Sequence, residues 1–268
     1  MSSSPTITFR ELVDVHEIDE LSAVFDKIWA TSPGPAHFGT AMLIALHHGG
    51  HYVVGVFAED MLIGGCVGFF VEPFGEVLHS HIAGVLPEFA GQGIGRTLKF
   101  HQRDWCLKRG VHTIRWTFDP LVARNAYFNI QRLGAEPSEY TPNFYGSMTD
   151  GINSGDATDR MLVSWNLNGS APGPRSSANL TDIVKVLHPT ATGEPRMIQI
   201  PPDAADIAVG IPRDIEQLRR IDRASAFVWR HALREYLAPL VASTQWHSTG
   251  FDPSGFYTFT TTRATPGE

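Results

Sequence analysis

Cysteine is scarce in this sequence. Its 268 residues include only Cys66 and Cys106, with no Cys-x-x-Cys pair and no histidine beside them at metal-ligand spacing. Disulfide frameworks and zinc sites need more numerous or more closely spaced cysteines. The sequence therefore predicts neither, and we expect no metal cofactor. Both thiols are expected to be buried, as free cysteines usually are.

Positive charge is also in short supply. Lys and Arg number 21 against 28 Asp and Glu, which gives a formal net charge of −7. That sign is wrong for a protein whose main partner is nucleic acid or an anionic membrane, so we expect neither, and any anion must be bound locally. No apolar run reaches the ~18 residues of a membrane span, and MSSSPTITFRELVD lacks the basic-then-apolar pattern of a secretion signal. We therefore expect a cytoplasmic protein.

Apolar residues are plentiful, at 43%, so the chain can bury a substantial core. The segment 168–195 is rich in Gly, Pro, Ser and Thr, which is typical of a loop or linker. We therefore expect a first domain in 1–170, a linker in 171–195 and a C-terminal subdomain in 196–268. About 70 residues are few for an independent core, so the subdomain is expected to dock on the first domain.

The hydrophobic periodicity predicts an α/β (α+β) fold. Helices are expected from Asp14 to about Ile28 and over 37–48, 94–109, 123–133 and 213–240, and strands over 6–9, 51–58, 61–72, 77–85, 112–118, 160–167, 197–201 and 256–262. Turn residues between the strands that cover 51–85 favour an antiparallel meander. The strand at 77–85 then enters a helix directly, which predicts one βαβ passage.

The turn of that passage reads VLPEFAGQGIGRTLK over 85–99, with Gly91, Gly93 and Gly95 at alternate positions. A strand that enters a helix through glycines leaves the first helical N–H groups free for an anion such as a phosphate. A tight connection without a ligand is the alternative. The turn is not a P-loop, because no Gly-Lys-Ser/Thr follows, and Leu98 stands where a Rossmann turn has its third glycine.

The residues around this turn resemble motif A of the Gcn5-related N-acetyltransferase (GNAT) superfamily, in which (Gln/Arg)-x-x-Gly-x-(Gly/Ala) holds the pyrophosphate of acyl-CoA. Ala90 stands at the Gln/Arg position, which removes a side chain but no backbone donor. Leu133-Gly134-Ala135 resembles a later motif of the family, so the resemblance covers roughly 6–167. HSHIAGVLPE, WTFDPLVARNAYFN and WRHALRE also resemble a subgroup that includes amino-acid N-succinyltransferases.

The resemblance implies a GNAT fold, with a central mixed, mostly antiparallel sheet splayed at the glycine-turn strand and a C-terminal α/β extension. It also implies acetyl-CoA or succinyl-CoA as cosubstrate. The residues expected to bind it are Ala83, Gly84, Val85, Ala90, Gly91, Gln92, Gly93, Ile94, Gly95, Arg96 and Asn125, the last of which is otherwise a local backbone cap.

Acyl transfer to an amine needs a base for the ammonium and a proton source for the leaving thiolate. His79 is the first candidate for the base, because the resemblance places it where histone-acetylating members carry a catalytic glutamate. Alternation along the strand predicts His79, His81 and Ala83 on one face, so His81 is a close rival; strand histidines without a chemical role are the alternative. The same alternation predicts the side chains of Ser80 and Ile82 on the other face of the strand.

The usual acid of the family is a tyrosine, but Ile130 occupies its position and Ala123 replaces a common asparagine. Tyr145 or Tyr127 could substitute. A CoA thiolate can also leave without enzymic protonation.

The acceptor is expected to be a small-molecule amine or an amino acid, with Asn143, Tyr145, Asp159 and Arg160 near its pocket. Arg230 and Arg234, four residues apart, need an anion to answer them: either a substrate carboxylate or, as favoured here, an Asp or Glu of the first domain. The sequence thus predicts an N-acyltransferase; a catalytically idle CoA-binding or regulatory module and an O-acyltransferase are the alternatives. It does not give the oligomeric state, so a homodimer stays open.

Overall fold

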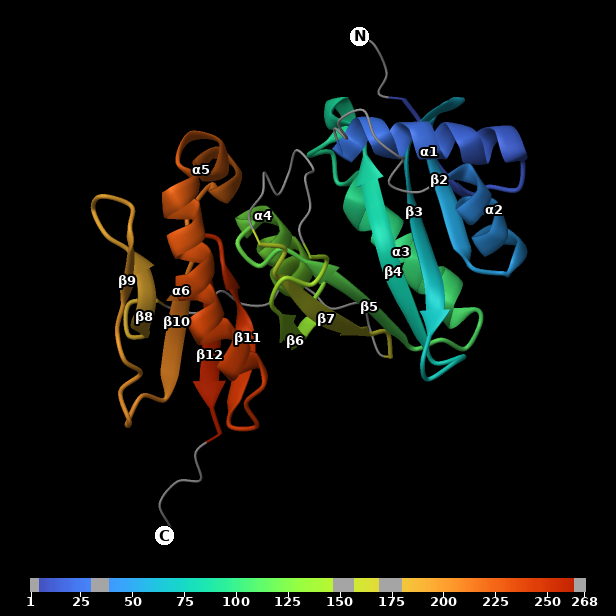
Figure 1. Ribbon diagram of the computed structural model, residues 1–268. Coiled ribbons are helices and arrows are strands. Elements are labelled where there is room, and N and C mark those ends of the chain that lie inside the picture. The colour runs from blue at the N-terminus through green and yellow to red at the C-terminus, as the bar shows by residue number, and fades with distance from the viewer. Residues whose placement is uncertain (1–4, 30–38, 147–156, 169–179, 263–268) are drawn as a thin grey trace. The chain divides into compact units, whose positions relative to one another are not determined.

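The computed structural model describes residues 5–29, 39–146, 157–168 and 180–262 (Figure 1). The chain divides into two compact units. The described residues of unit 1 are 5–29, 39–116 and 166–168, and those of unit 2 are 117–146, 157–165 and 180–262. The predicted domain boundaries at 170 and 195 stay a prediction.

Unit 1 contains a sheet in the strand order β1-β2-β3-β4-β5. The first four strands pair antiparallel and β5 pairs parallel to β4, which confirms a mixed, mostly antiparallel sheet. The bounds are β1 Ile7–Glu11, β2 Tyr52–Ala58, β3 Met61–Val71, β4 Val77–Val85 and β5 Thr113–Phe118, whose last two residues belong to unit 2.

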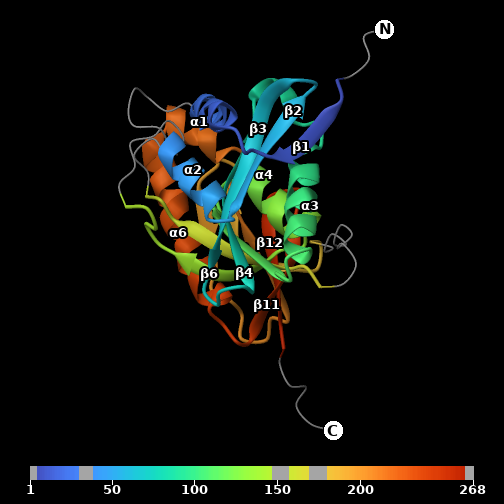
Figure 2. The ribbon, with the colours of Figure 1, turned by 90° about the vertical axis from the view of Figure 1, so that its right-hand side faces the viewer.

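Helices cover both faces of this sheet (Figure 2). Helices α1 (Val15–Trp29) and α2 (Thr40–His48) lie on one face, and α3 (Ile94–Leu107) lies on the other; the short 3₁₀ helix η1 (Pro87–Phe89) precedes α3. The α1 periodicity follows the prediction, because its buried residues are spaced three and four apart.

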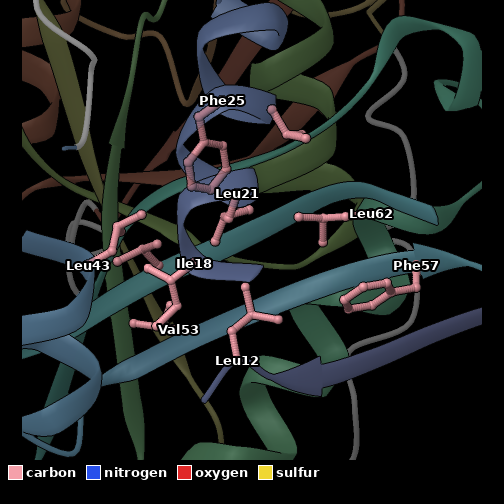
Figure 3. Packing of buried hydrophobic residues seen from close by; sticks show 10 residues of the cluster. Leu12, Ile18, Leu21, Phe25, Leu43, Val53, Phe57 and Leu62 are labelled. Atoms are coloured by element: carbon pink, nitrogen blue, oxygen red, sulfur yellow. The ribbon is translucent and has the colours of Figure 1, made fainter. Parts of the chain in front are cut away.

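The apolar side of α1 packs on β2 and β3 to form one core of unit 1 (Figure 3). Leu12, Leu21 and Phe25 have no exposed surface, and Gly65 lets Leu21 approach the sheet, since a Cβ at 65 would lie 2.5 Å from the leucine Cδ1. Burial of each large side chain contributes roughly 1.5–3 kcal/mol. This packing fixes β3 and, through the ladder, β4.

The pairing of β4 with β5 is short. It covers Val77↔Thr113, Leu78↔Ile114 and His79↔Arg115. Within the described residues of unit 1, the β5-facing edge of residues 80–85 has no ladder partner. The splay predicted at the glycine-turn strand therefore begins at His79.

Unit 2 contains a second sheet in the order β11-β12-β10-β8-β9, with α6 packed along it (Figure 1). Its strands are β8 Val184–Pro189, β9 Pro195–Met197, β10 Asp206–Gly210, β11 Trp246–Asp252 and β12 Phe256–Thr261. The antiparallel pair β6 (Glu136–Thr141) and β7 (Arg160–Asn166) precedes them. Strand β8 lies inside the segment expected to be a linker, and residues 198–201, expected to be a strand, are not in one.

The predicted helix at 213–240 is two helices, α5 (Ile215–Ile221) and α6 (Arg223–Val241). Asp214 accepts a hydrogen bond from the Gln217 N–H (2.8 Å), and Asp222 accepts one from the Ser225 N–H (3.0 Å). Each aspartate is thus an N-cap, and the second cap ends one helix and begins the next. Periodicity carries across the break, so it did not reveal the cap.

The helix predicted over 123–133 begins as α4 (Ala123–Ala126) and continues as a π-helical turn, η2 (Tyr127–Arg132). The Leu133 N–H donates to the Phe128 carbonyl five residues back (3.0 Å). Such turns shift every following side chain around the helix, which spacing in the sequence cannot show.

Candidate active site

The glycine turn between β4 and α3 has the backbone conformation that only glycine adopts readily. Gly91 and Gly93 have φ of +79° and +80°, and Gly93 is the N-cap of α3. Gly95 has no such requirement, yet a Cβ at 91, 93 or 95 would meet no atom within 4 Å. The glycines therefore border open space at the positive end of a 14-residue helix.

This turn fits the pyrophosphate of an acyl-CoA. The first N–H groups of α3 have no intrahelical partner by the geometry of a helix, and a side chain at 95 would fill the space that a phosphate needs. Ala90 has its N–H bonded to the Pro87 carbonyl (3.1 Å) and ends the short helix η1, so its methyl group leaves the turn intact. Ala90, Gly91, Gln92, Gly95 and Arg96 are exposed, whereas Ile94 is buried and acts as an anchor.

Strand β4 carries a β-bulge at His81. Gly68 of β3 opposes Ser80 and the next residue, Val67, opposes Ile82, so His81 is the extra residue. Ser80 accepts a hydrogen bond from Lys99 of α3, whereas Ile82 packs on the α1 side of the sheet. The expectation that Ser80 and Ile82 share a face is therefore wrong, because strict alternation ignores the bulge.

The bulge keeps the two histidines together. The His79 and His81 rings are 5.9 Å apart, and both lie against Phe69, with centroid distances of 5.2 and 5.7 Å. Both rings are partly buried. The structure thus places both candidate bases in one aromatic cluster, on the strand that ends at Ala83, Gly84 and Val85.

Burial shifts both imidazoles toward the neutral form. It is the main cause that lowers the pKa of His79 to about 4, and the charges of His81 and Lys99 add to it. Burial also lowers the pKa of His81. At neutral pH both rings therefore have a lone pair that can accept a proton. The cost of a buried imidazolium makes His79 a weaker base than a solvent-exposed histidine.

A buried lysine lies on the opposite face of β4. Lys99 Nζ donates to Ser80 Oγ (2.7 Å) and Gln102 Oε1 (3.2 Å) and sits 4.1 Å from the Trp116 ring centroid. Burial lowers its pKa to about 8. Gln102 in turn donates to Cys66 Sγ (3.3 Å), whose thiol is buried, as is that of Cys106. Nothing in the local sequence distinguishes Lys99 from a surface lysine of an amphipathic helix.

Two predicted residues, Asn125 and Tyr145, belong to unit 2. Asn125 lies in α4 and is partly exposed, and Tyr145 is 41% exposed with its hydroxyl 3.4 Å from Thr117 Oγ1. Ile130, at the usual position of the catalytic tyrosine, has no exposed surface and belongs to the core. The assignments of Asn125 to cofactor binding and of Tyr145 to the acid therefore stay predictions.

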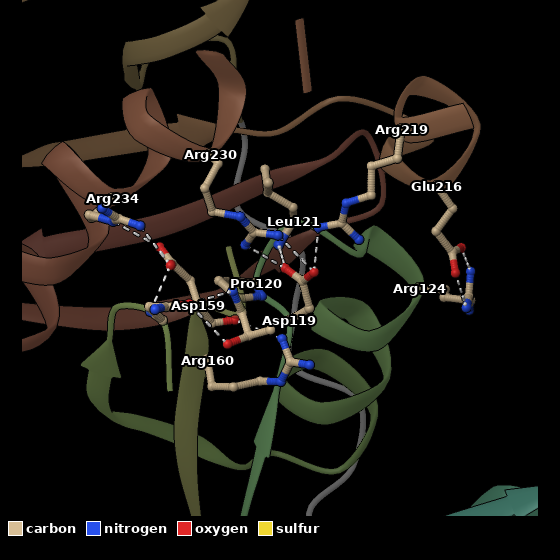
Figure 4. Close-up of polar contacts among 12 residues, drawn as sticks. Asp119, Pro120, Leu121, Arg124, Asp159, Arg160, Glu216, Arg219, Arg230 and Arg234 are labelled. Atoms are coloured by element: carbon tan, nitrogen blue, oxygen red, sulfur yellow. Dashed lines mark hydrogen bonds and ion pairs between the residues drawn. The ribbon is translucent and has the colours of Figure 1, made fainter. Parts of the chain in front are cut away.

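Arg230 and Arg234 of α6 form ion pairs with two aspartates of residues 117–165 (Figure 4). This agrees with the expectation that an Asp or Glu, rather than a substrate carboxylate, pairs with them. Arg230 donates from both terminal nitrogens to Asp119 (2.8 and 2.9 Å), and Arg219 of α5 adds a third bond of 2.6 Å. Arg234 donates to both oxygens of Asp159 (2.9 and 2.7 Å).

Both carboxylates are buried and serve structure. Burial alone would raise the Asp119 pKa, but the guanidinium groups of Arg230 and Arg219 hold it well below its usual range. Asp159 also accepts from the Tyr140 hydroxyl (2.7 Å) and the Asn143 N–H (3.0 Å), so both of its oxygens are engaged in bonds within the protein. Its expected place near the acceptor pocket stays a prediction. Sequence reasoning did not single out Asp119, although the pair Asp119-Pro120 directly after a strand could have drawn attention to it.

Two searches of the described residues are negative. They contain no group of three or more His, Cys, Asp and Glu side chains arranged to hold a metal ion. Nor does any helix in the described ranges have the length and apolarity to cross a membrane.

Comparison with known proteins agrees with this geometry. Residues 15–134 match the model of the Acetyltransferase (GNAT) family. No curated protein sequence matches the chain. The match to a GNAT-family domain thus covers residues 15–134, and it supports an acyltransferase.

Solved structures similar to this chain include three that match about 60% or more of it, and the first of them supports the fold. A protein of Acinetobacter baylyi ADP1, named as a candidate acetyltransferase, matches with a TM-score of 0.51 at 14% identity, over 66% of this chain and 100% of its own. A GNAT family acetyltransferase of Elizabethkingia anophelis with acetyl-CoA bound matches with 0.44 at 13%, over 60% and 97%. Arabidopsis thaliana Naa50 in complex with a bisubstrate analogue matches with 0.44 at 20%, over 59% and 97%.

Proposed function

We propose that the chain is an acyl-CoA-dependent N-acyltransferase that transfers an acetyl or succinyl group to the amine of a small molecule or an amino acid. The glycine turn carries this proposal, because Gly91, Gly93 and Gly95 leave open space at the start of α3 directly after the splayed, histidine-bearing strand β4. The family match over 15–134 supports acyl transfer, and the subgroup resemblance is the reason to include the succinyl group. A cytoplasmic location and a homodimeric state remain predictions.

In the reaction, an imidazole of His79 or His81 takes a proton from the acceptor ammonium. The freed nitrogen attacks the thioester carbonyl carbon; the N–C bond forms, the C–S bond breaks, and the sulfur leaves with the electron pair. The nitrogen loses its second proton to solvent, and the thiolate takes up a proton from solvent to give the free thiol. The neutral state of both rings at neutral pH fits the first step. Ala83, Gly84 and Val85 have a backbone edge without a ladder partner in unit 1, which is available to the pantetheine arm.

The first test separates binding at the turn from folding. Gly95→Glu places a carboxylate at the N-terminus of α3, where a negative charge stabilises a helix, and it meets no protein atom within 4 Å at Cβ. We expect normal folding and at least a tenfold loss of acetyl-CoA or succinyl-CoA affinity by calorimetry. Gly39→Glu, at the N-terminus of α2, is the matched control, because Gly39 has a φ of −62° and a Cβ there also meets no atom within 4 Å. Unchanged affinity in Gly95→Glu would refute the site.

The second test concerns the chemistry. Wild type is assayed for release of free thiol from acetyl-CoA and succinyl-CoA with a panel of amines and amino acids, and His79→Ala, His81→Ala and the double variant follow. We expect one single variant to lose at least a hundredfold in kcat/KM. Acyl-CoA binding without thiol release from any pair would refute the enzyme, and full turnover in the double variant would refute the base.

A further inference from the structure

Four buried polar side chains of unit 1 join α3 to strands β3 and β4. Lys99 Nζ donates to Ser80 Oγ (2.7 Å) and to Gln102 Oε1 (3.2 Å). Gln102 Nε2 donates to Cys66 Sγ (3.3 Å), and this sulfur lies 3.6 Å from Ser80 Oγ. Each of the four side chains is at most 5% exposed. They close a ring of polar contacts, which we call the Lys99 ring.

The Lys99 ring is attached to β4 at the residue before its bulge. Gly68 of β3 opposes Ser80, and His81 is the extra residue of the bulge. A Cβ at residue 68 would lie 3.1 Å from Gln102 Nε2, so the glycine opposite Ser80 leaves room for the amide of the ring. A shift of the pairing by one residue would remove the bulge and turn the following side chains to the other face. The hydrogen bond to Ser80 opposes such a shift.

An ammonium group is a costly choice for this position. Burial lowers the Lys99 pKa to about 8, whereas the nearby thiols of Cys66 and Cys106 favour the charged form. The amine is therefore mostly charged at neutral pH, with its Nζ 4.1 Å from the centre of the Trp116 ring. A methionine would fill a similar volume without the cost of desolvating a charge. The hydrogen bonds and the charge of Lys99 thus distinguish it from a residue that only packs.

The charge of Lys99 acts on the histidines from the opposite face of β4. It is one of three causes that lower the His79 pKa to about 4, after burial and the charge of His81. The ionisable groups to consider around His79 are therefore His81 on the same strand, Lys99 of α3, and Arg115, which pairs with His79 in the ladder of β4 with β5. A fixed positive charge at this place favours the neutral imidazole, which is the form that accepts a proton.

We propose that Lys99 is a positioning residue of the acyl-transfer site, which acts through Ser80 to fix the bulge of β4 that holds His81 beside His79. Lys99 is 5% exposed, so it acts through the strand and through its charge. The inference rests on the proposed N-acyltransferase function, in which one of the two imidazoles takes a proton from the acceptor ammonium.

The experiment compares three variants of the full chain with wild type. Lys99→Met removes the charge and the hydrogen bonds at a similar side-chain length. Ser80→Ala removes the hydrogen bond to β4 and keeps the ammonium group. Lys108→Met is the matched control, because it makes the same change in an exposed lysine at the C-cap of α3.

The first readout is NMR of the histidine side chains, which needs no turnover. The His79 signal is identified by its absence from His79→Ala. Its pKa should rise by about 0.5 or more in Lys99→Met, because a repelling charge is removed, and should stay unchanged in Lys108→Met. The cross-peaks between the His79 and His81 rings, 5.9 Å apart in the structure, should weaken in Lys99→Met and in Ser80→Ala.

An unchanged His79 pKa in Lys99→Met overturns the inference, because a residue that serves stability alone would leave that pKa where it is. Unchanged cross-peaks in Ser80→Ala overturn it as well. The second result decides the question if Lys99→Met does not fold.

The second readout is steady-state kinetics with the acyl-CoA and amine that wild type uses. Lys99→Met and Ser80→Ala should each lower kcat by about tenfold or more and change the KM of acyl-CoA less than about twofold, because the glycine turn is untouched. Full kcat in both variants, or an equal loss in Lys108→Met, overturns the inference. If wild type releases no thiol with any pair, the proposed function fails, and the NMR results still support or overturn the role of Lys99 in placing the two histidines.

Discussion

Replacement of Asp119 by asparagine should destabilise unit 2 by about 3–5 kcal/mol, the cost of a broken buried ion pair. The carboxylate accepts three charge-assisted hydrogen bonds, of 2.6, 2.8 and 2.9 Å, from Arg219 and Arg230, and it also accepts the Leu121 N–H at 3.0 Å. Asp119 is 7% exposed and the two arginines are 1% and 0% exposed. Asparagine keeps the volume but removes the negative charge that these two buried guanidinium groups bond.

The assay should report on unit 2 alone, because two units need not unfold together. Amide hydrogen exchange of peptides from α6 (Arg223–Val241) gives the free energy of opening for the helix that supplies Arg230. Asp203→Asn, a change at an exposed aspartate, is the matched control and should stay within about 0.5 kcal/mol of wild type. In the cycle with Arg230→Met, the double variant should lose less than the sum of the single variants.

The pH dependence gives an independent check on the same pair. The Asp119 pKa is lower in the folded than in the unfolded protein, so its contribution is fully present above about pH 4 and is lost as the pH falls through the folded pKa. Asp119→Asn should lack this acid-dependent loss. A destabilisation below about 1 kcal/mol, together with an unchanged acid profile, would refute the reasoning that this pair holds the helices.

Two further predictions concern unit 1. The Lys99 pKa of about 8, against an ordinary 10.5, implies a cost of about 3 kcal/mol for the charged form in the folded protein. Between pH 8 and 10.5 the unfolded chain still binds this proton and the folded chain does not, so the free energy of unfolding of wild type relative to Lys99→Met should rise by that amount in denaturant titrations. A difference that does not change with pH would contradict a buried ammonium. If His79 is the base, kcat/KM measured in short assays at low pH should fall with an apparent pKa near 4 instead of 6.5. A fall in kcat/KM with an apparent pKa of 6.5 that is absent in His79→Ala would show that the ring is solvated.

Sequence patterns were reliable where local chemistry decides the structure. The spacing of Ile18, Leu21 and Phe25 predicts α1, and glycines at 91 and 93 predict a turn that needs positive φ. Both features depend on neighbours within a few residues: helical periodicity and the absence of a Cβ. The family domain and the mixed sheet followed from the same turn and from the order of the elements.

Tertiary contacts decided what the patterns could not. The bulge at His81 arises in the pairing of β3 with β4, where two successive residues of β3 oppose Ser80 and Ile82. Alternation along β4 alone cannot reveal it. The partners of Arg230 and Arg234 lie 111 and 75 residues away, at Asp119 and Asp159. A residue's own neighbours in sequence carry no record of such pairings, because the free energy that selects them arises only when charges are brought together out of water. The sequence by itself therefore determined the glycine turn before α3 and the order of most elements. The tertiary structure decided that His79 and His81 lie together and that Arg230 and Arg234 form buried ion pairs.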